Sequence, residues 1–137
     1  MNLFTYGTLM FPLIFVAVTG RHFPAEKAWL YDYARYCVKG QSFPAIVKQS
    51  GAVTDGLVYQ DMDRSAIEQI DRFEGALYQR LSVTVYLAEG SDLPARVYVI
   101  RPEHRGRLIR QPWSVGTFRR CHQQDFLNTY AGFSRTP

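Results

Sequence analysis

The sequence contains few of the residues from which disulfide frameworks and metal sites are built. Its 137 residues include only two cysteines, Cys37 and Cys121, and three histidines. The cysteines lie far apart and outside any Cys-x-x-Cys arrangement, and the histidines form no metal-ligand spacing with them. We therefore expect reduced thiols in a cytoplasmic protein without a metal site, although a single disulfide is also compatible with the sequence.

Long hydrophobic runs are absent as well. The apolar segment Phe11–Val18 is far too short to cross a bilayer, and no basic stretch precedes it as one does in a signal peptide. We therefore expect no signal peptide, no membrane-spanning segment and no membrane partner.

Charge of one sign is not concentrated in any long block. The chain carries 16 Lys and Arg residues against 12 Asp and Glu residues, a formal net charge of +4. This mild excess permits anionic partners without requiring them. The basic run Arg101–Arg110 has no accompanying aromatic platform or helical phase, so a solvated loop is favoured over a phosphate or nucleic-acid surface. We expect no nucleic-acid partner.

What the sequence does contain is typical of one globular domain. Hydrophobic residues make up 47% of the chain and charged residues 20%, which is the composition of a soluble folded protein. A chain of this length buries one core, is too short for two ordinary domains, and shows no repeat or linker. We expect residues 1–137 to form a single domain.

Short β-prone segments are interspersed with helical ones. The predicted strands are residues 2–6, 28–38, 45–47, 52–59, 80–87 and 95–100, with a break at Gln49-Ser50-Gly51 and a hairpin over residues 81–100. The predicted helices are residues 12–19, a helix that Asp63 caps and Gly75 ends, and residues 114–130. This order is not the alternation of a βαβ protein, and it predicts an α+β fold with a closed or strongly curled sheet.

The last of these helices carries an aromatic stripe. Ser114 is its predicted cap, and Trp113 and Phe118 occupy the positions of a hydrophobic staple. The stripe recurs every four residues, at Phe118, His122, Phe126 and Tyr130. We interpret it as a core contact rather than a cofactor site, and His122 as a packing residue rather than a ligand.

Glu74 is the carboxylate around which the chain is organised. The helical spacing that buries Ile67 and Ile70 continues onto Glu74, so its side chain is predicted to face the interior. Burial raises the pKa of a carboxylic acid unless a cation pairs with it, and a raised pKa suits a general base near neutral pH. The alternative is a structural glutamate paired with Arg72 or Arg80.

A second candidate feature is the turn that follows the first strand. Gly7 comes directly after the β-prone residues 2–6, and it begins the segment Gly7-Thr8-Leu9. Such a turn can point successive backbone N–H groups in one direction, forming a nest for an anion or a carbonyl oxygen. A plain strand-to-helix turn is the alternative.

Together these motifs resemble the γ-glutamylcyclotransferase-like family, in particular its AIG2-like branch. The resemblance rests on Tyr6-Gly7-Thr8-Leu9 and, much later, on Asp71-Arg72-Phe73-Glu74-Gly75 followed by Tyr78 and Arg80. The segments Phe43–Val47, Gly56–Tyr59 and Trp113–Phe118 also fit, so the match runs over nearly the whole chain in the expected order.

The resemblance implies a small mixed β-barrel flanked by helices, with a cavity in which the loop faces the glutamate. It implies that Tyr6, Gly7, Thr8 and Leu9 bind the γ-glutamyl part of a small-molecule substrate through backbone groups. It implies that Glu74 is the catalytic acid and base.

The chemistry of a γ-glutamyl amide is consistent with such a site. Its α-amine can attack its own γ-carbonyl, closing 5-oxoproline and releasing an amine, and this intramolecular reaction needs only a folded substrate, a proton shuttle and a stabilised oxyanion. Glu74 would move the proton, and N–H groups of the loop would hold the carboxylate or the oxyanion. Tyr78 would either orient Glu74 or simply pack, and no cofactor is required.

Two other classes of function are compatible with the sequence. The same barrel can serve as a non-catalytic module that binds a small ligand, and the basic balance is compatible with a nucleic-acid or protein-interaction role. Neither the group on the γ-carbonyl nor the oligomeric state follows from the sequence.

Overall fold

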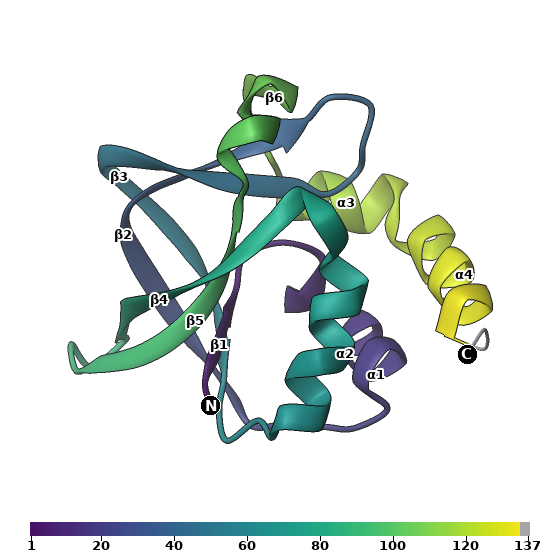
Figure 1. The fold of residues 1–137 in the computed structure, drawn as a ribbon, viewed down its shortest axis with the longest axis horizontal. Helices are drawn as coiled ribbons and strands as arrows, with labels where there is room; N and C mark the ends of the chain where they lie inside the picture. Colours follow the sequence, from purple (N-terminus) through teal and green to yellow (C-terminus); the bar gives the residue numbers. More distant parts are fainter. Residues whose placement is uncertain (135–137) are drawn as a thin grey trace.

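The protein folds as a β-barrel with its helices gathered at one end, as Figure 1 shows. The computed structural model describes the backbone of residues 1–134 and the side chains of residues 1–128. The strands are β1 (Leu3–Thr5), β2 (Ala25–Val38), β3 (Pro44–Tyr59), β4 (Tyr78–Leu87), β5 (Asp92–Ile100) and β6 (Leu108–Pro112). The helices are α1 (Pro12–Thr19), α2 (Arg64–Glu74), α3 (Val115–Cys121) and α4 (Gln123–Ser134), with short 3₁₀ turns η1 (Thr8–Met10), η2 (Gly75–Leu77) and η3 (Pro102–Arg107).

The barrel closes through the pairing of β2 with β3. The strands run in the order β3-β1-β5-β4-β2, and the additional β3–β2 pairing joins the two ends of this row, while β6 adds to the outside of β2. β1 runs parallel to β5 with Leu3 opposite Arg96, and the other pairs are antiparallel. The predicted α+β fold, a small mixed barrel flanked by helices, is confirmed.

Alternation along the strands creates two hydrophobic cores. Phe4 faces the barrel interior, whereas its neighbour Leu3 belongs to the core between barrel and helices. The interior core also contains Tyr6, Leu30, Ile46, Val58, Val85, Val97 and Val99. On the helix side, the rings of Phe15 and Tyr59 stack with centroids 3.7 Å apart, which fixes α1 against β3.

The short strand β1 is held in place by a glycine of β3. A Cβ atom on Gly56 would lie 2.0 Å from the carbonyl oxygen of Thr5, so only glycine allows the two backbones this approach. The Thr5 hydroxyl donates to Leu57 O at 2.9 Å. The end of β1, from which the Tyr6–Leu9 loop departs, is therefore tightly fixed.

The break predicted at Gln49-Ser50-Gly51 is wrong, because Pro44–Tyr59 is one continuous strand. The register instead jumps, with Tyr31 opposite Val53 and Tyr33 opposite Lys48. Asp32 adopts φ = 65° in this bulge, and its carboxylate accepts a hydrogen bond from Gly51 N at 2.9 Å. The polar segment therefore forms a bulge within a paired strand, since its long partner β2 continues past it.

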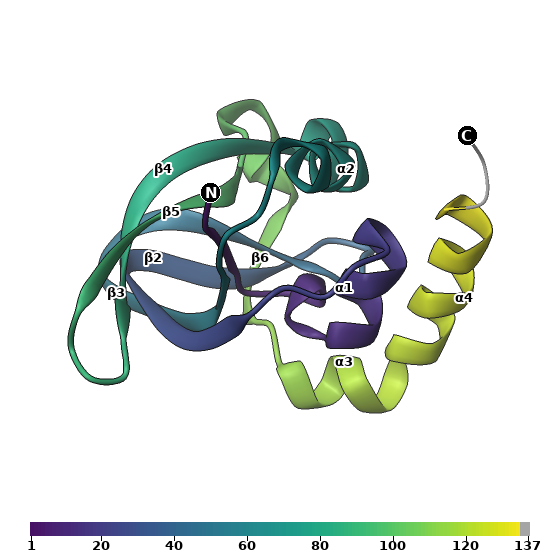
Figure 2. The same ribbon diagram turned by 90° about the horizontal axis from the view of Figure 1, so that it is seen from below.

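The single helix predicted over residues 114–130 is also wrong in one respect. The predicted cap is confirmed, since Ser114 Oγ accepts from Thr117 N at 3.2 Å, and Trp113 lies 5.8 Å from Phe118 between ring centroids. The helix, however, breaks at His122 into α3 and α4, which meet at an angle in Figure 2. The bend lets Phe126 contact Phe118; the side chain of Tyr130 lies outside the described residues.

The basic run at residues 101–110 is not the expected loop. It forms η3 and the start of β6, which pairs with β2 through Val38 opposite Leu108. The reason is tertiary, because β2 extends beyond the barrel and offers a free edge to this segment. The run is thereby divided, and Arg101 lines a different pocket from Arg105.

Two expectations from composition can be compared with the structure. Cys37 and Cys121 are both free thiols, so the disulfide alternative is not realised. Among the helices of the described residues, none has the length and apolarity needed to cross a membrane.

Candidate functional site

The loop that follows β1 presents unused backbone donors. Gly7 O accepts from Met10 N at 3.0 Å, which closes the turn into η1. In the described part of the chain, the N–H groups of Gly7, Thr8 and Leu9 donate to no acceptor. Tyr6, Thr8 and Leu9 are buried, so these donors lie in a sheltered cavity rather than in bulk solvent.

An arginine that the sequence did not single out holds this loop. Arg35 Nη1 donates to Tyr6 O at 2.8 Å and to Asp55 O at 3.0 Å, while Nη2 pairs with the Asp55 carboxylate at 2.9 Å. Its side chain is only 15% exposed and lies over the Trp113 ring. Charge-assisted hydrogen bonds of this kind are strong and directional, so Arg35 positions the carbonyl next to Gly7. No local pattern marks Arg35, because its partners come from the loop after β1 and from β3.

Gly7 is required for the packing of the loop. A Cβ atom at this position would lie 2.7 Å from Cγ and 2.8 Å from Cδ of Pro44, the first residue of β3. The glycine therefore lets the loop pack against the rigid proline ring.

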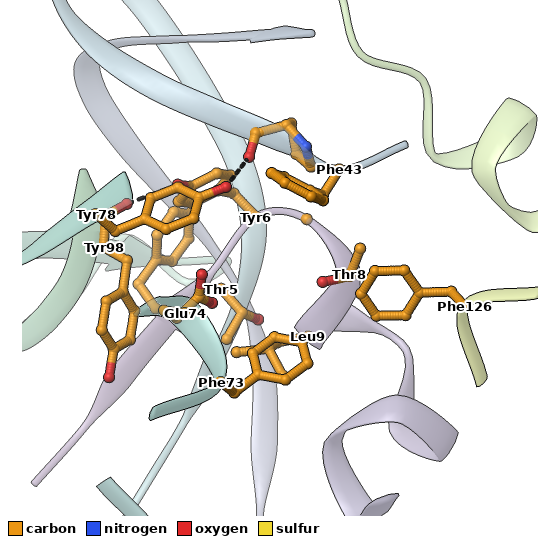
Figure 3. A pocket seen from close by; sticks show the side chains of 13 residues that line it. Thr5, Tyr6, Thr8, Leu9, Phe43, Phe73, Glu74, Tyr78, Tyr98 and Phe126 are labelled. Atoms are coloured by element: carbon orange, nitrogen blue, oxygen red, sulfur yellow. Dashed lines mark hydrogen bonds between the residues drawn. The ribbon is translucent and has the colours of Figure 1, made fainter. Parts of the chain in front are cut away.

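Helix α2 delivers Glu74 to the same cavity, as the helical phase predicts. Asp63 Oδ1 accepts from Ala66 N at 2.9 Å and caps the helix, and Gly75 ends it with φ = 71°. Ile67 and Ile70 are buried on the same face. In Figure 3 the Glu74 carboxylate points toward the loop that begins at Thr5 and Tyr6.

Glu74 does not form the ion pair that was its structural alternative. Among the described residues it has no salt bridge, because Arg72 is exposed and Arg80 Nη1 instead lies 3.3 Å from Asp71 Oδ2. The Glu74 side chain is partly exposed as a whole, but its carboxyl end is enclosed. Burial, followed by the negative charge of Asp71, raises the pKa of Glu74 to about 8.

Three tyrosine hydroxyls shape the polar wall around Glu74. Tyr6 OH donates to Tyr98 O at 2.6 Å, Tyr98 OH donates to Asp71 Oδ1 at 2.5 Å, and Tyr78 OH donates to Pro44 O at 2.6 Å. Burial raises the pKa of Tyr6 and of Tyr98, so both remain neutral donors at physiological pH. The hydroxyl of Tyr78 thereby links the cavity wall to the start of β3.

Aromatic rings make up much of the remaining wall of the cavity. Its volume is about 60 Å³, and its wall combines the loop and Glu74 with rings from several elements: Phe4, Phe43, Phe73, Tyr78, Tyr98 and Phe126 (Figure 3). Such a lining limits the access of water and strengthens electrostatic interactions inside. Within the described residues, no three His, Cys, Asp or Glu side chains are grouped in a way that would hold a metal ion.

Sequence reasoning named Glu74 and the loop but missed Asp71 and Tyr98 as parts of the site. A signal existed for both. Asp71 lies three residues before Glu74 on the same helix, so the two carboxylates are neighbours on its surface. In the predicted hairpin, Tyr98 is the cross-strand partner of Arg80, which belongs to the motif that contains Glu74. The distance of Tyr98 from Asp71 along the chain concealed their hydrogen bond.

Comparison with known proteins identifies the family. The family model described as gamma-glutamyl cyclotransferase, AIG2-like, matches residues 3–115, a stretch that contains both the loop and Glu74. The chain therefore belongs to this family.

Individual relatives are distant but cover most of the chain. It is 26% identical over 130 residues to Protein AIG2 C of Arabidopsis thaliana, covering 94% of this chain and 78% of that protein. A solution structure of an Arabidopsis thaliana protein superposes with a TM-score of 0.73 at 24% identity, covering 99% of this chain and 84% of that protein's chain. A structure described as a gamma-glutamyl cyclotransferase gives a TM-score of 0.65 at 16% identity, covering 95% and 85%. These structural likenesses concern the fold.

Proposed function

We propose that the protein is a γ-glutamylcyclotransferase that converts a small γ-glutamyl amide or amine derivative to 5-oxoproline and a free amine. The observation that carries this proposal is one cavity that combines Glu74 with the N–H groups of Gly7, Thr8 and Leu9, where the described residues offer neither an ion pair to Glu74 nor an acceptor to these N–H groups. Family membership supports it. The alternative is a module of the same fold that binds the ligand without turnover.

The loop would bind and orient the substrate. Its N–H groups would donate hydrogen bonds to the α-carboxylate or to the oxyanion that develops on the γ-carbonyl oxygen. Because Arg35 and Pro44 fix the loop before any ligand arrives, little reorganisation is needed on binding.

Glu74 would move the proton. In its ionised form it takes a proton from the α-ammonium group, and the freed amine attacks the γ-carbonyl carbon. The new C–N bond closes the five-membered lactam, the bond to the leaving nitrogen breaks, and Glu74 returns its proton to that nitrogen. The ring nitrogen still carries a second proton, which passes through the ionised Glu74 to the released amine, so that 5-oxoproline is left with one lactam N–H and the amine departs as an ammonium ion. A pKa of about 8 allows both proton removal and proton return near neutral pH.

The proposed setting is the cytoplasm, with reduced thiols and a small-molecule substrate, and the chemistry requires no cofactor and no nucleic-acid partner. Tyr78 would support the site as part of its wall, through the hydrogen bond that its hydroxyl donates to Pro44 O.

The decisive test replaces Glu74 with glutamine. Glu74→Gln preserves shape but cannot exchange a proton, so release of 5-oxoproline from a panel of γ-glutamyl amides, followed by mass spectrometry, should fall by about 100-fold or more. Binding of the same amides, measured by calorimetry, should be retained.

The matched control is Glu68→Gln, which removes the same charge from an exposed position of α2. It should leave turnover unchanged. Turnover retained by Glu74→Gln would refute the catalytic role, and binding without 5-oxoproline in the wild type would favour the binding module.

A further inference from the structure

A second pocket lies beside the cavity and is lined by arginines. It has a volume of about 360 Å³, and Tyr78 and Tyr98 line both it and the cavity. Arg80, Arg96 and Arg101 contribute to its wall, and all three are partly buried. Nothing in the proposed cyclisation uses these three side chains.

The β4–β5 hairpin brings the three arginines together. Arg80 lies directly opposite Tyr98 in the antiparallel register. Arg96 precedes Tyr98 by two residues on β5 and therefore shares its face of the sheet. Arg101 follows the end of β5, and its backbone N–H donates to Leu77 O at 2.9 Å, which holds it beside η2. Strand register therefore places Arg80 and Arg96, and of the basic run at residues 101–110 only its first residue, Arg101, lines this pocket.

The positive charge of this pocket is poorly compensated. Among the described residues that line it, Asp71 is the only carboxylate, and Asp71 Oδ1 already accepts the Tyr98 hydroxyl. Arg80 Nη1 lies 3.3 Å from Asp71 Oδ2, yet this buried nitrogen makes no hydrogen bond within the described chain. Among the same residues, neither Arg96 nor Arg101 forms an ion pair. Three cations against one carboxylate leave an excess of two positive charges in the pocket.

We infer that this pocket is a binding site for a compact oxyanion, a phosphate group or a polycarboxylate. Guanidinium groups bind such oxygens through paired N–H donors, and partial burial makes the attraction stronger than at an exposed position. Arg96 and Arg101 form no ion pair within the described residues, so their guanidinium groups are the ones that a bound oxyanion would satisfy.

The other basic pocket of the described chain is a weaker candidate. Arg105 and Arg110 line it together with Lys48, but both arginines are exposed. Arg110 already lies over the Tyr36 ring, 5.9 Å from its centroid. Exposed charges gain little from an ionic contact because solvent screens it. Anion binding at this exposed pocket is therefore the outcome against which binding at the Arg80, Arg96 and Arg101 pocket is compared.

Titration of the whole chain with inorganic phosphate and, separately, with citrate tests the proposal at low ionic strength. Calorimetry gives the affinity, and two-dimensional amide NMR locates the ligand. At least one anion should bind, with amide shifts clustered at residues 75–80 and 96–101. Tighter binding of phosphate would identify the ligand as a phosphate group, and tighter binding of citrate would identify it as a polycarboxylate. Binding of neither anion, or shifts clustered at residues 105–110, would overturn the inference.

Paired variants sharpen the result. The double substitution Arg96→Gln and Arg101→Gln should weaken binding by about tenfold or more, because hydrogen bonds to a charged partner are lost. Arg64→Gln with Arg107→Gln removes the same charge from exposed positions outside both basic pockets and should change the affinity by less than about twofold, since exposed charges are screened. Equal weakening in both pairs would show a general charge effect and refute a specific site. The wild-type NMR map decides the location even if the first pair folds poorly.

Discussion

Asp71 is the residue that most directly adjusts the chemistry of Glu74. It accepts the Tyr98 hydroxyl on one oxygen and faces Arg80 with the other, so its carboxylate is held in place beside the cavity. Its charge is the second cause of the raised pKa of Glu74, after burial. Asp71 is thus a positioning and tuning residue that need not touch the substrate.

Substitution of Asp71 by asparagine tests this role. Removing the negative charge should lower the pKa of Glu74 below about 8, although burial still keeps it above its ordinary value. The rise of kcat/KM with pH that reflects ionisation of Glu74 should therefore move to lower pH. The profile is measured for wild type, Asp71→Asn and Glu68→Gln, the last as a control for loss of charge on the same helix. An unshifted Asp71→Asn profile would show that Asp71 does not act on Glu74.

At the level of elements, the site depends on the contact between the loop and the start of β3. Pro44 packs against Gly7 and accepts the Tyr78 hydroxyl, so it joins the Tyr6–Leu9 loop to β4. Arg35 adds a link from β2 to the loop through Tyr6 O. The loop is therefore held by strands of the barrel and not by its own hydrogen bonds alone.

Gly7→Ala is expected to disturb this contact. The added methyl group meets the Pro44 ring, which cannot rotate away, so the loop must shift at a cost of about 1–3 kcal/mol in the free energy of unfolding. Affinity for γ-glutamyl amides should fall with it. Gly106→Ala is the matched control, because its Cβ would meet no atom within 4 Å. A Gly7→Ala protein with wild-type melting temperature and affinity would contradict the packing argument, whereas Thr8→Ser should be mild because backbone groups bind the ligand.

At the level of the whole molecule, an acid buried without a cation influences stability. The folded-state pKa of Glu74, about 8, lies above the 4.5 of the free group, so the folded state binds its proton more tightly than the unfolded state. Its contribution to stability is therefore complete below about pH 4.5 and is lost as the pH rises through about 8.

The pH dependence of melting temperature measures this contribution. The melting temperature of the wild type should contain a fall between about pH 4.5 and 8 that Glu74→Gln lacks. The melting temperature of the variant should therefore rise relative to that of the wild type as the pH increases. Glu68→Gln should keep the wild-type slope. Parallel curves for wild type and Glu74→Gln would mean that Glu74 is neutralised by a partner or is well solvated.

The sequence by itself determined the parts of this protein that follow from local rules. The cap at Asp63, the helical phase through Ile67 and Ile70, and the stop at Gly75 together placed Glu74 inward, because the period of a helix fixes which residues share a face. The turn at Gly7 and the β4–β5 hairpin were predicted for similar reasons, from a glycine after a strand and from alternation around a short turn.

The tertiary structure decided which of these parts meet. Closure of the barrel by β2 and β3 sets the registers that place Arg35 under Tyr6 O and Tyr98 on Asp71, and no local pattern encodes either contact. Because β2 and β3 pair along nearly their whole length, the break predicted at residues 49–51 became a bulge within β3. The start of the same strand places Pro44 against Gly7. Glu74 has a raised pKa for the same reason: helical phase turned it inward, but only the surrounding strands and rings could remove water and leave it without a cation.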